Sequence, residues 1–148
     1  MLNKKSTIQL AYLAGFLDGD GSIYVRAKQN SDYKYGFQIA PYVIFFQSKK
    51  EESNFRKIFS KIGFGYMRER KDGILEYTIA RKDNIIFLLN ILRPYLVLKR
   101  KQADLMIKIL EKKEKVSNYE DFKRLMKLVE RYRDLNYSKK RLKHKLTP

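Results

Sequence analysis

Apolar and polar residues recur along the chain with two different periods, which predict helices and strands in a definite order. Residues 7–20 carry apolar side chains at helical spacing, and the preceding Ser6-x-x-Gln9 pattern favours a helix start. Residues 23–30 alternate between apolar and polar side chains, so they predict a strand with one buried face. A second strand is predicted over about 37–47, and Pro41 within it indicates a bulge or an unpaired edge position.

The rest of the chain predicts one more hairpin and several helices. Ser48-x-x-Glu51 is a capping box before a stripe of apolar residues, and Asp72-Gly73 predicts a tight turn between strands near 65–71 and 75–81. Further helices are expected from a cap at Asp83 to Pro94, over about 100–113, and from Ser117-x-x-Glu120 onward. We therefore expect a single α+β domain over residues 1–148. It would comprise a four-stranded antiparallel sheet with helices on one face, in the order αββαββα, followed by C-terminal helices.

The first predicted helix has a face made only of small residues. Ala11, Gly15 and Gly19 are spaced by four, so they lie on one side and allow the backbone of a second helix to approach closely. If that second helix belongs to another copy of the chain, two Asp20 carboxylates meet at the base of the contact. Paired carboxylates in a basic protein suggest divalent metal ions that act on phosphate.

Charge and composition narrow the class of partner. The chain has 33 Lys and Arg against 16 Asp and Glu, a formal net charge of +17, which favours a polyanion and above all nucleic acid. No apolar run reaches spanning length and no signal peptide opens the chain, so we expect no membrane partner. The absence of Cys excludes thiolate sites and fits an intracellular protein of a prokaryotic cytoplasm or an organelle, not a secreted one. The single His144 lies in a basic tail and is interpreted as a solvated bystander, and no small-molecule substrate is expected.

Three segments carry a resemblance to a known family. Residues 12–21, with the sequence Tyr-Leu-Ala-Gly-Phe-Leu-Asp-Gly-Asp-Gly, resemble the signature helix of the LAGLIDADG homing endonucleases. The predicted element order and the segments 64–70 and 94–103 are similar to that family as well. Because the motif occurs once, the chain resembles the homodimeric branch that is encoded in mobile introns. The expected dimer interface is the small-residue face of Ala11, Gly15 and Gly19.

The resemblance implies roles for particular residues. Asp20 would bind the catalytic Mg²⁺, with the Gly19 carbonyl as a second ligand. Gln47 matches a residue that orders water in the active site, and Lys99 matches a lysine near the scissile phosphate. Asp18 matches an acid that serves a structural purpose. We expect Mn²⁺ to substitute for Mg²⁺, and Ca²⁺ to support binding without efficient cleavage.

One position departs from the family pattern. Glu51 stands where relatives often carry an arginine that assists the same water network. Its place in the predicted capping box gives it a structural explanation. Either Lys49 or Lys50 could supply the missing positive charge, and the sequence does not choose between them.

The polar face of the predicted sheet is rich in side chains suited to base edges. Guanidinium, ammonium and amide groups match guanine and adenine in the major groove, and a carboxylate can accept from cytosine. A twisted sheet face of this kind fits the groove of double-stranded DNA. The basic tail at Ser138, Lys139, Lys140 and Arg141 is expected to hold phosphates. The predicted contacts on the sheet and its turns are Tyr24, Arg26, Lys28, Asn30, Tyr33, Gln38, Tyr42, Ile44, Arg68, Arg70, Glu76, Thr78 and Arg81.

These features together predict a site-specific DNA endonuclease that promotes intron mobility. Such an enzyme makes a double-strand break in a long, pseudo-palindromic target by Mg²⁺-dependent phosphodiester hydrolysis. One alternative is a non-cleaving DNA- or RNA-binding protein of the same fold, either an intron maturase or a transcriptional regulator. Another is a general nucleic-acid coat or ribosomal protein, which would leave the signature helix unexplained.

Overall fold

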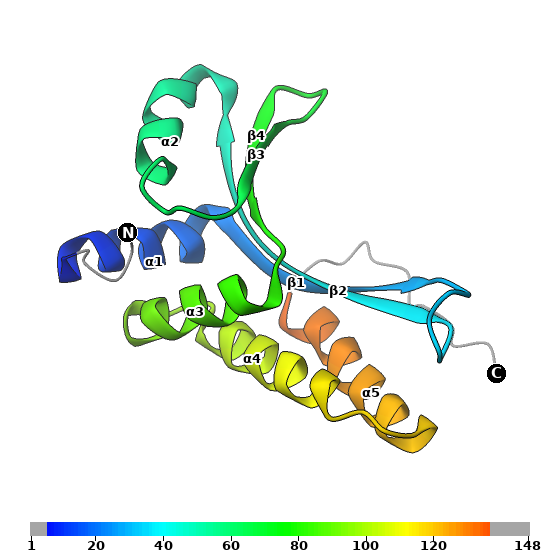
Figure 1. The fold of residues 1–148 in the computed structure, drawn as a ribbon. Coiled ribbons are helices and arrows are strands. Elements are labelled where there is room, and N and C mark those ends of the chain that lie inside the picture. The colour runs from blue at the N-terminus through cyan, green and yellow to red at the C-terminus, as the bar shows by residue number, and fades with distance from the viewer. Residues whose placement is uncertain (1–5, 137–148) are drawn as a thin grey trace.

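The computed structural model describes residues 6–136, and its elements follow the predicted order. The helices and strands are α1 (Thr7–Asp20), β1 (Gly21–Gln29), β2 (Phe37–Ser48), the 3-10 helix η2 (Lys49–Glu51), α2 (Glu52–Phe59), β3 (Tyr66–Glu69), β4 (Ile74–Ile79), α3 (Lys82–Leu92), the 3-10 helix η3 (Arg93–Tyr95), α4 (Arg100–Glu114) and α5 (Tyr119–Leu135). The strands form one antiparallel sheet in the order β1-β2-β4-β3 (Figure 1). The predicted α+β fold is confirmed.

The two faces of the sheet differ sharply. Ile23, Val43 and Ile79 lie opposite one another on β1, β2 and β4, and each is fully buried beneath the helices. They belong to a hydrophobic core that also includes side chains from all five α-helices. The alternating residues of these strands and of β3 point to the other face, which carries Tyr24, Tyr42 and Arg68. The helices thus cover one face and leave the other open to a partner.

Helix α1 passes into β1 without an intervening loop, and Gly21 makes this possible. A Cβ atom at Gly21 would lie 2.5 Å from the Leu17 side chain and 2.8 Å from the Leu17 carbonyl oxygen. Its own N–H donates to that carbonyl and ends the helix. Only glycine therefore allows the chain to turn from helix to strand directly after Asp20.

Pro41 lies in a stretch of β2 that is paired on one side only, and it causes no bulge. It pairs in continuous register with Val25 of β1, while the pairing of β2 with β4 begins at Val43 opposite Ile79. On its β4 side Pro41 therefore has no paired residue, so its missing N–H costs no ladder bond there. Of the two predicted explanations, the edge position is confirmed.

Several predicted boundaries were wrong, and at two helix starts the reason is the side-chain cap. Helix α3 begins after Arg81 without a side-chain cap, and Asp83 lies inside its first turn. Helix α5 is capped by Asn118, whose side chain accepts from the Asp121 N–H. The strands of the second hairpin are shorter than predicted, at Tyr66–Glu69 and Ile74–Ile79.

None of the helices within residues 6–136 has the length and apolar character needed to span a membrane.

Candidate active site and nucleic-acid interface

The end of α1 presents two carboxylates in opposite environments. Asp18 is buried at 9% exposure, whereas Asp20, two residues later, is exposed together with Gly19. Helical spacing explains the difference, because Asp18 follows Ala14 on the core side and Asp20 points away from it. The structure thus separates a carboxylate with a structural role from one that is free to meet a ligand.

Asp18 holds the segment between η3 and α4. Its carboxylate accepts from the backbone N–H groups of Val97 and Leu98 at 2.8 and 3.1 Å, and of Lys99 at 2.9 Å. Three charge-assisted bonds satisfy the buried carboxylate and order a turn that has no regular structure of its own. The predicted structural role of Asp18 is confirmed.

Lys99 is brought to the same end of α1 by this turn. Its ammonium donates to the Asp18 carbonyl at 2.5 Å. Burial lowers the pKa of Lys99 below its usual value, while the negative charges of Asp18 and Asp20 oppose that decrease. Asp20 is therefore close enough to act electrostatically on Lys99, although the two residues are 79 positions apart in the sequence.

Gln47 and Glu51 line one pocket of about 390 Å³ between α1, α2 and the end of β2. The Gln47 side-chain oxygen accepts from the Ser48 N–H at 2.8 Å. The Ser48 hydroxyl caps η2 by accepting from the Lys50 N–H. The Glu51 carboxylate does not return to Ser48 but accepts from the Asn54 amide at 2.9 Å. The predicted capping box is therefore only half formed.

A cation that the sequence did not single out lines the same pocket. Lys57 of α2 joins Gln47 and Glu51 there, while Lys49 forms an ion pair with Glu69 at 2.8 Å. Lys57 resembles many other surface lysines in the sequence, so no pattern could have selected it. Lys49 is less available than predicted as a replacement for the family arginine.

The donor set for a metal ion consists of hard oxygen ligands. Within residues 6–136 no group of three or more His, Cys, Asp and Glu side chains could hold a metal ion. One chain offers the exposed Asp20 carboxylate and the neighbouring Gly19 carbonyl, which suit Mg²⁺ or Ca²⁺ but do not complete a coordination sphere. The residues fit a metal site that is completed by groups outside this chain.

The open face of the sheet gathers most of the predicted DNA contacts. Strand register places Tyr24 opposite Tyr42 and Lys28 opposite Gln38, with Arg26 between them on β1. Arg26, Lys28, Arg68 and Arg70 are exposed, and Tyr24, Gln38 and Tyr42 are half-buried. The structure therefore brings these side chains together on one surface, as the alternation predicted.

Three predicted contacts are buried, contrary to expectation. Ile44, Thr78 and Glu76 are 5%, 4% and 6% exposed, although they lie on the open face. The Glu76 carboxylate receives Arg68 Nη2 at 2.6 Å and approaches Arg70 Nη1 at 3.8 Å. This interaction raises the pKa of Arg68 above its usual value. Glu76 is thus occupied by arginines and is not an open acceptor for cytosine.

The remaining predicted contacts lie at turns or beyond the described residues. Asn30 follows β1, and its side-chain oxygen accepts from the Asp32 N–H in the turn that also carries the exposed Tyr33. Arg81 lies after β4, at the start of α3, and is out of phase with Glu76 and Thr78, so it does not extend the open face of that strand. The tail residues Ser138, Lys139, Lys140 and Arg141 lie outside the described residues.

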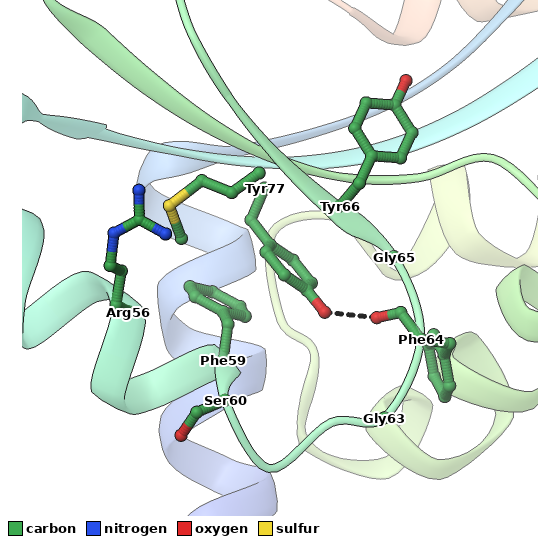
Figure 2. Close-up of a pocket in the computed structure, with 9 residues that line it drawn as sticks. Arg56, Phe59, Ser60, Gly63, Phe64, Gly65, Tyr66 and Tyr77 are labelled. Carbon is green, nitrogen blue, oxygen red and sulfur yellow. Dashed lines mark hydrogen bonds between the residues drawn. The ribbon is translucent and has the colours of Figure 1, made fainter.

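A second pocket, of about 370 Å³, lies between α2 and the β3–β4 hairpin (Figure 2). Its wall includes Phe59 stacked on Tyr77 at 4.4 Å between ring centroids, and the Tyr77 hydroxyl donates to the Phe64 carbonyl. Gly65 has a φ of +91°, and a Cβ there would lie 2.9 Å from the Thr78 carbonyl oxygen. These contacts hold the hairpin on α2, and we assign the pocket a structural role.

The outer side of α1 is apolar and uncovered. Ile8 and Tyr12 are 80% and 57% exposed, and nothing lies within 4 Å of a Cβ placed on Gly15 or Gly19. Val97 and Leu98, held by Asp18, are also exposed, at 79% and 71%. This surface has the character of a protein–protein contact, with close backbone approach at the glycines.

The chain belongs to the LAGLIDADG endonuclease family, whose model matches residues 13–112. It is 38% identical over 102 residues to the DNA endonuclease I-CreI of Chlamydomonas reinhardtii, and 34% identical over 110 residues to I-CvuI of Chlorella vulgaris. These matches cover 69% and 74% of this chain, and 62% and 68% of the two relatives. The predicted family is confirmed.

Solved structures agree with the family assignment. The fold matches I-CvuI in complex with its target in the presence of calcium, with a TM-score of 0.84 and 30% identity over 92% of this chain and 87% of that chain. I-CvuI has also been solved on the I-CreI target in the presence of magnesium, with the DNA uncleaved. The archaeal intron-encoded I-Vdi141I shares the fold at a TM-score of 0.80 and 20% identity, over 95% of this chain and 91% of that one. Divalent metals thus accompany DNA in the related complexes of I-CvuI.

Proposed function

We propose that this chain is a site-specific homing endonuclease that makes a double-strand break in DNA. The observation that carries the proposal is the exposed Asp20 carboxylate, which lies within electrostatic reach of Lys99 and directly before the first strand of a basic sheet face. Relatives named as DNA endonucleases support it. The whole chain, residues 1–148, would act as a single LAGLIDADG domain.

The active enzyme would be a homodimer formed through α1. The contact would use Ala11, Gly15 and Gly19, flanked by the exposed Ile8 and Tyr12. Two-fold symmetry would place the two Asp20 carboxylates together and supply the ligands that one chain lacks. It would also align the two open sheet faces with two half-sites, so the target would be pseudo-palindromic.

Asp20 and the Gly19 carbonyl would hold Mg²⁺, with Mn²⁺ as a substitute and Ca²⁺ supporting binding without efficient cleavage. When bound, such a cation would acidify a water molecule and neutralise negative charge on the phosphate. Lys99 would stabilise the additional negative charge that develops on the phosphate during attack. Gln47 would orient water, because its amide N–H₂ remains available while its oxygen accepts from Ser48.

The open sheet face would lie in the major groove. Arg26, Lys28, Gln38, Arg68 and Arg70 would read base edges, and Asn30 and Tyr33 would contact the outer part of each half-site. The tail residues Ser138, Lys139, Lys140 and Arg141 would hold phosphates, so replacing the lysines should weaken all sequences alike and reduce the salt slope by about one unit per lost contact. Ile44, Thr78 and Glu76 would not contact bases because they are buried, and Arg81 would not because it lies beyond β4.

A cleavage assay tests the proposal against its rival, a maturase or regulator of the same fold. The purified protein is incubated with Mg²⁺ and a library of intron-insertion junctions, and the new DNA ends are sequenced. We expect cuts in both strands at one sequence, leaving short 3′ overhangs as in the family, and none with the Asp20→Asn variant. Specific binding without any cleavage would favour the maturase or regulator.

The location of the protein in a cytoplasm or organelle stays a prediction.

A further inference from the structure

The open face of the sheet is divided into bands of different chemistry. The exposed Arg68 and Arg70 form a first cationic band at the β3 edge, and Arg26 and Lys28 form a second cationic band on the outer half of β1. Between them, strand register places an aromatic band of Tyr24, Tyr42 and Tyr66. The order follows from pairing: Tyr66 shares a row with Thr78 and Ile44, and the next row outward holds Tyr24 opposite Tyr42.

The aromatic band consists of a stacked tyrosine pair and a separate exposed tyrosine. The rings of Tyr24 and Tyr42 stack across β1 and β2, with centroids 5.2 Å apart and planes 29° apart. Tyr66 is 53% exposed, and Ile44 and Thr78 form a buried floor beside it. No helix among the described residues covers this face, since the helices pack on the opposite side (Figure 1).

An aromatic band is unusual on the open face of an antiparallel sheet, which is normally polar. Exposed apolar surface that is bordered by charged side chains marks a binding site. Arginine or lysine borders the band on both sides, with Arg68 paired to Glu76 and Arg70 to Asp72 at the β3 edge. Under the proposed function the partner is DNA, which is anionic outside and presents apolar groups between its phosphates. In the major groove of DNA the apolar group on a base edge is the C5-methyl of thymine.

We propose that Tyr24, Tyr42 and Tyr66 read thymine methyl groups, so that each half-site carries thymines between the segments contacted by the two cationic bands. The inference rests on the proposed function and specifies the sequence class of its target. Ring faces supply contact area to a methyl group without a directional hydrogen bond, so the band would select thymine by burial of that group.

The test begins with the target that the protein selects. The native protein is used with Ca²⁺ to select duplexes from a randomised library, and the enriched half-site is sequenced. Each thymine is then replaced by deoxyuridine, which removes the methyl group and keeps all hydrogen-bonding groups. We expect the dissociation constant to rise about four-fold for a methyl that contacts the band, and about fifteen-fold when both half-sites are changed.

Variants of Tyr42 separate the ring from its hydroxyl. Tyr42→Phe should keep the penalty for deoxyuridine, because the ring face remains, whereas Tyr42→Ser should bind thymine and deoxyuridine targets alike at that position. Tyr119→Ser is the matched control, since Tyr119 is 55% exposed on α5, which packs on the other side of the sheet. For Tyr119→Ser, replacing thymine by deoxyuridine should raise the dissociation constant as much as it does for the native protein.

The outcomes distinguish this inference from the proposed function. An enriched target that tolerates deoxyuridine at every position would overturn the inference and leave the endonuclease proposal intact. A deoxyuridine penalty that is unchanged in Tyr42→Ser, and in the corresponding variants of Tyr24 and Tyr66, would also overturn it. If no sequence is enriched at all, the proposed function fails, and the inference fails with it.

Discussion

Asp18 and Lys99 are joined by two hydrogen bonds that run through both the backbone and the side chain of the lysine. The Lys99 N–H donates to the Asp18 carboxylate at 2.9 Å, and the Lys99 ammonium donates to the Asp18 carbonyl at 2.5 Å. The same carboxylate binds the N–H groups of Val97 and Leu98. The end of the signature helix therefore positions the lysine and the exposed turn beside it.

Replacing Asp18 should uncouple this turn from the helix. Asp18→Ala leaves three backbone N–H groups without their acceptor, so we expect a loss of about 3 kcal/mol in the free energy of unfolding, measured in urea. Asp32→Ala, in the exposed β1–β2 turn, is the control and should change stability by less than about 0.5 kcal/mol. Equal stability of the two variants would contradict the role assigned to Asp18.

The pKa of Lys99 should report the charge of Asp20. Since burial lowers this pKa and Asp20 opposes the decrease, Asp20→Asn should lower it further. A folded-state pKa below that of the unfolded chain means that the unfolded chain binds more protons between the two values. The contribution of Lys99 to stability therefore rises with pH through that window, and below it the buried charge is destabilising.

NMR titration of the lysine side chain measures this directly. Asp104→Asn is the matched control, because Asp104 pairs with Arg93 at 2.5 Å and is not among the charges that act on Lys99. It should leave the Lys99 titration unchanged. A Lys99 pKa that does not respond to Asp20→Asn would remove the electrostatic link between the two residues.

Gly15→Leu should separate the subunits without unfolding the chain. A Cβ at Gly15 meets no atom within 4 Å, and leucine is a better helix former than glycine, so the monomer should remain folded. We expect a monomer in sedimentation experiments and loss of double-strand cleavage. Lys108→Leu, an exposed position on α4, is the control and should sediment as a dimer. A Gly15→Leu dimer would contradict the proposed interface.

Asp20→Asn should remove cleavage and leave specific DNA binding largely intact. Two carboxylates beside a phosphate repel it unless a cation lies between them, so without metal the variant should bind at least as tightly as the native protein. Adding Ca²⁺ should tighten binding of the native protein more than that of the variant. Affinity and cleavage are measured for both proteins with and without each ion, and near-native cleavage by the variant would exclude the metal assignment.

Local patterns predicted the elements well and the side-chain contacts only in part. The Asp72-Gly73 turn and the alternation of Ile23, Val25 and Ala27 are set by neighbours in sequence, and both are present. The burial of Glu76 depends on Arg68 from the neighbouring strand, eight residues away, which no periodicity encodes. Likewise, Lys57 reaches the Gln47 pocket only because α2 packs beside α1.

The direct passage from α1 into β1 has a mechanical consequence. Asp20 ends the helix and Gly21 begins the strand, with no residue between the carboxylate proposed to bind metal and the strand proposed to contact DNA. Each protomer would therefore hold Asp20 at a fixed position relative to its own sheet face, and the dimer would require a fixed rotation between the two half-sites. One base pair inserted at the centre of a target would rotate one half-site by about 34° relative to the other. The protein would reject such a site even though every base that it contacts is correct.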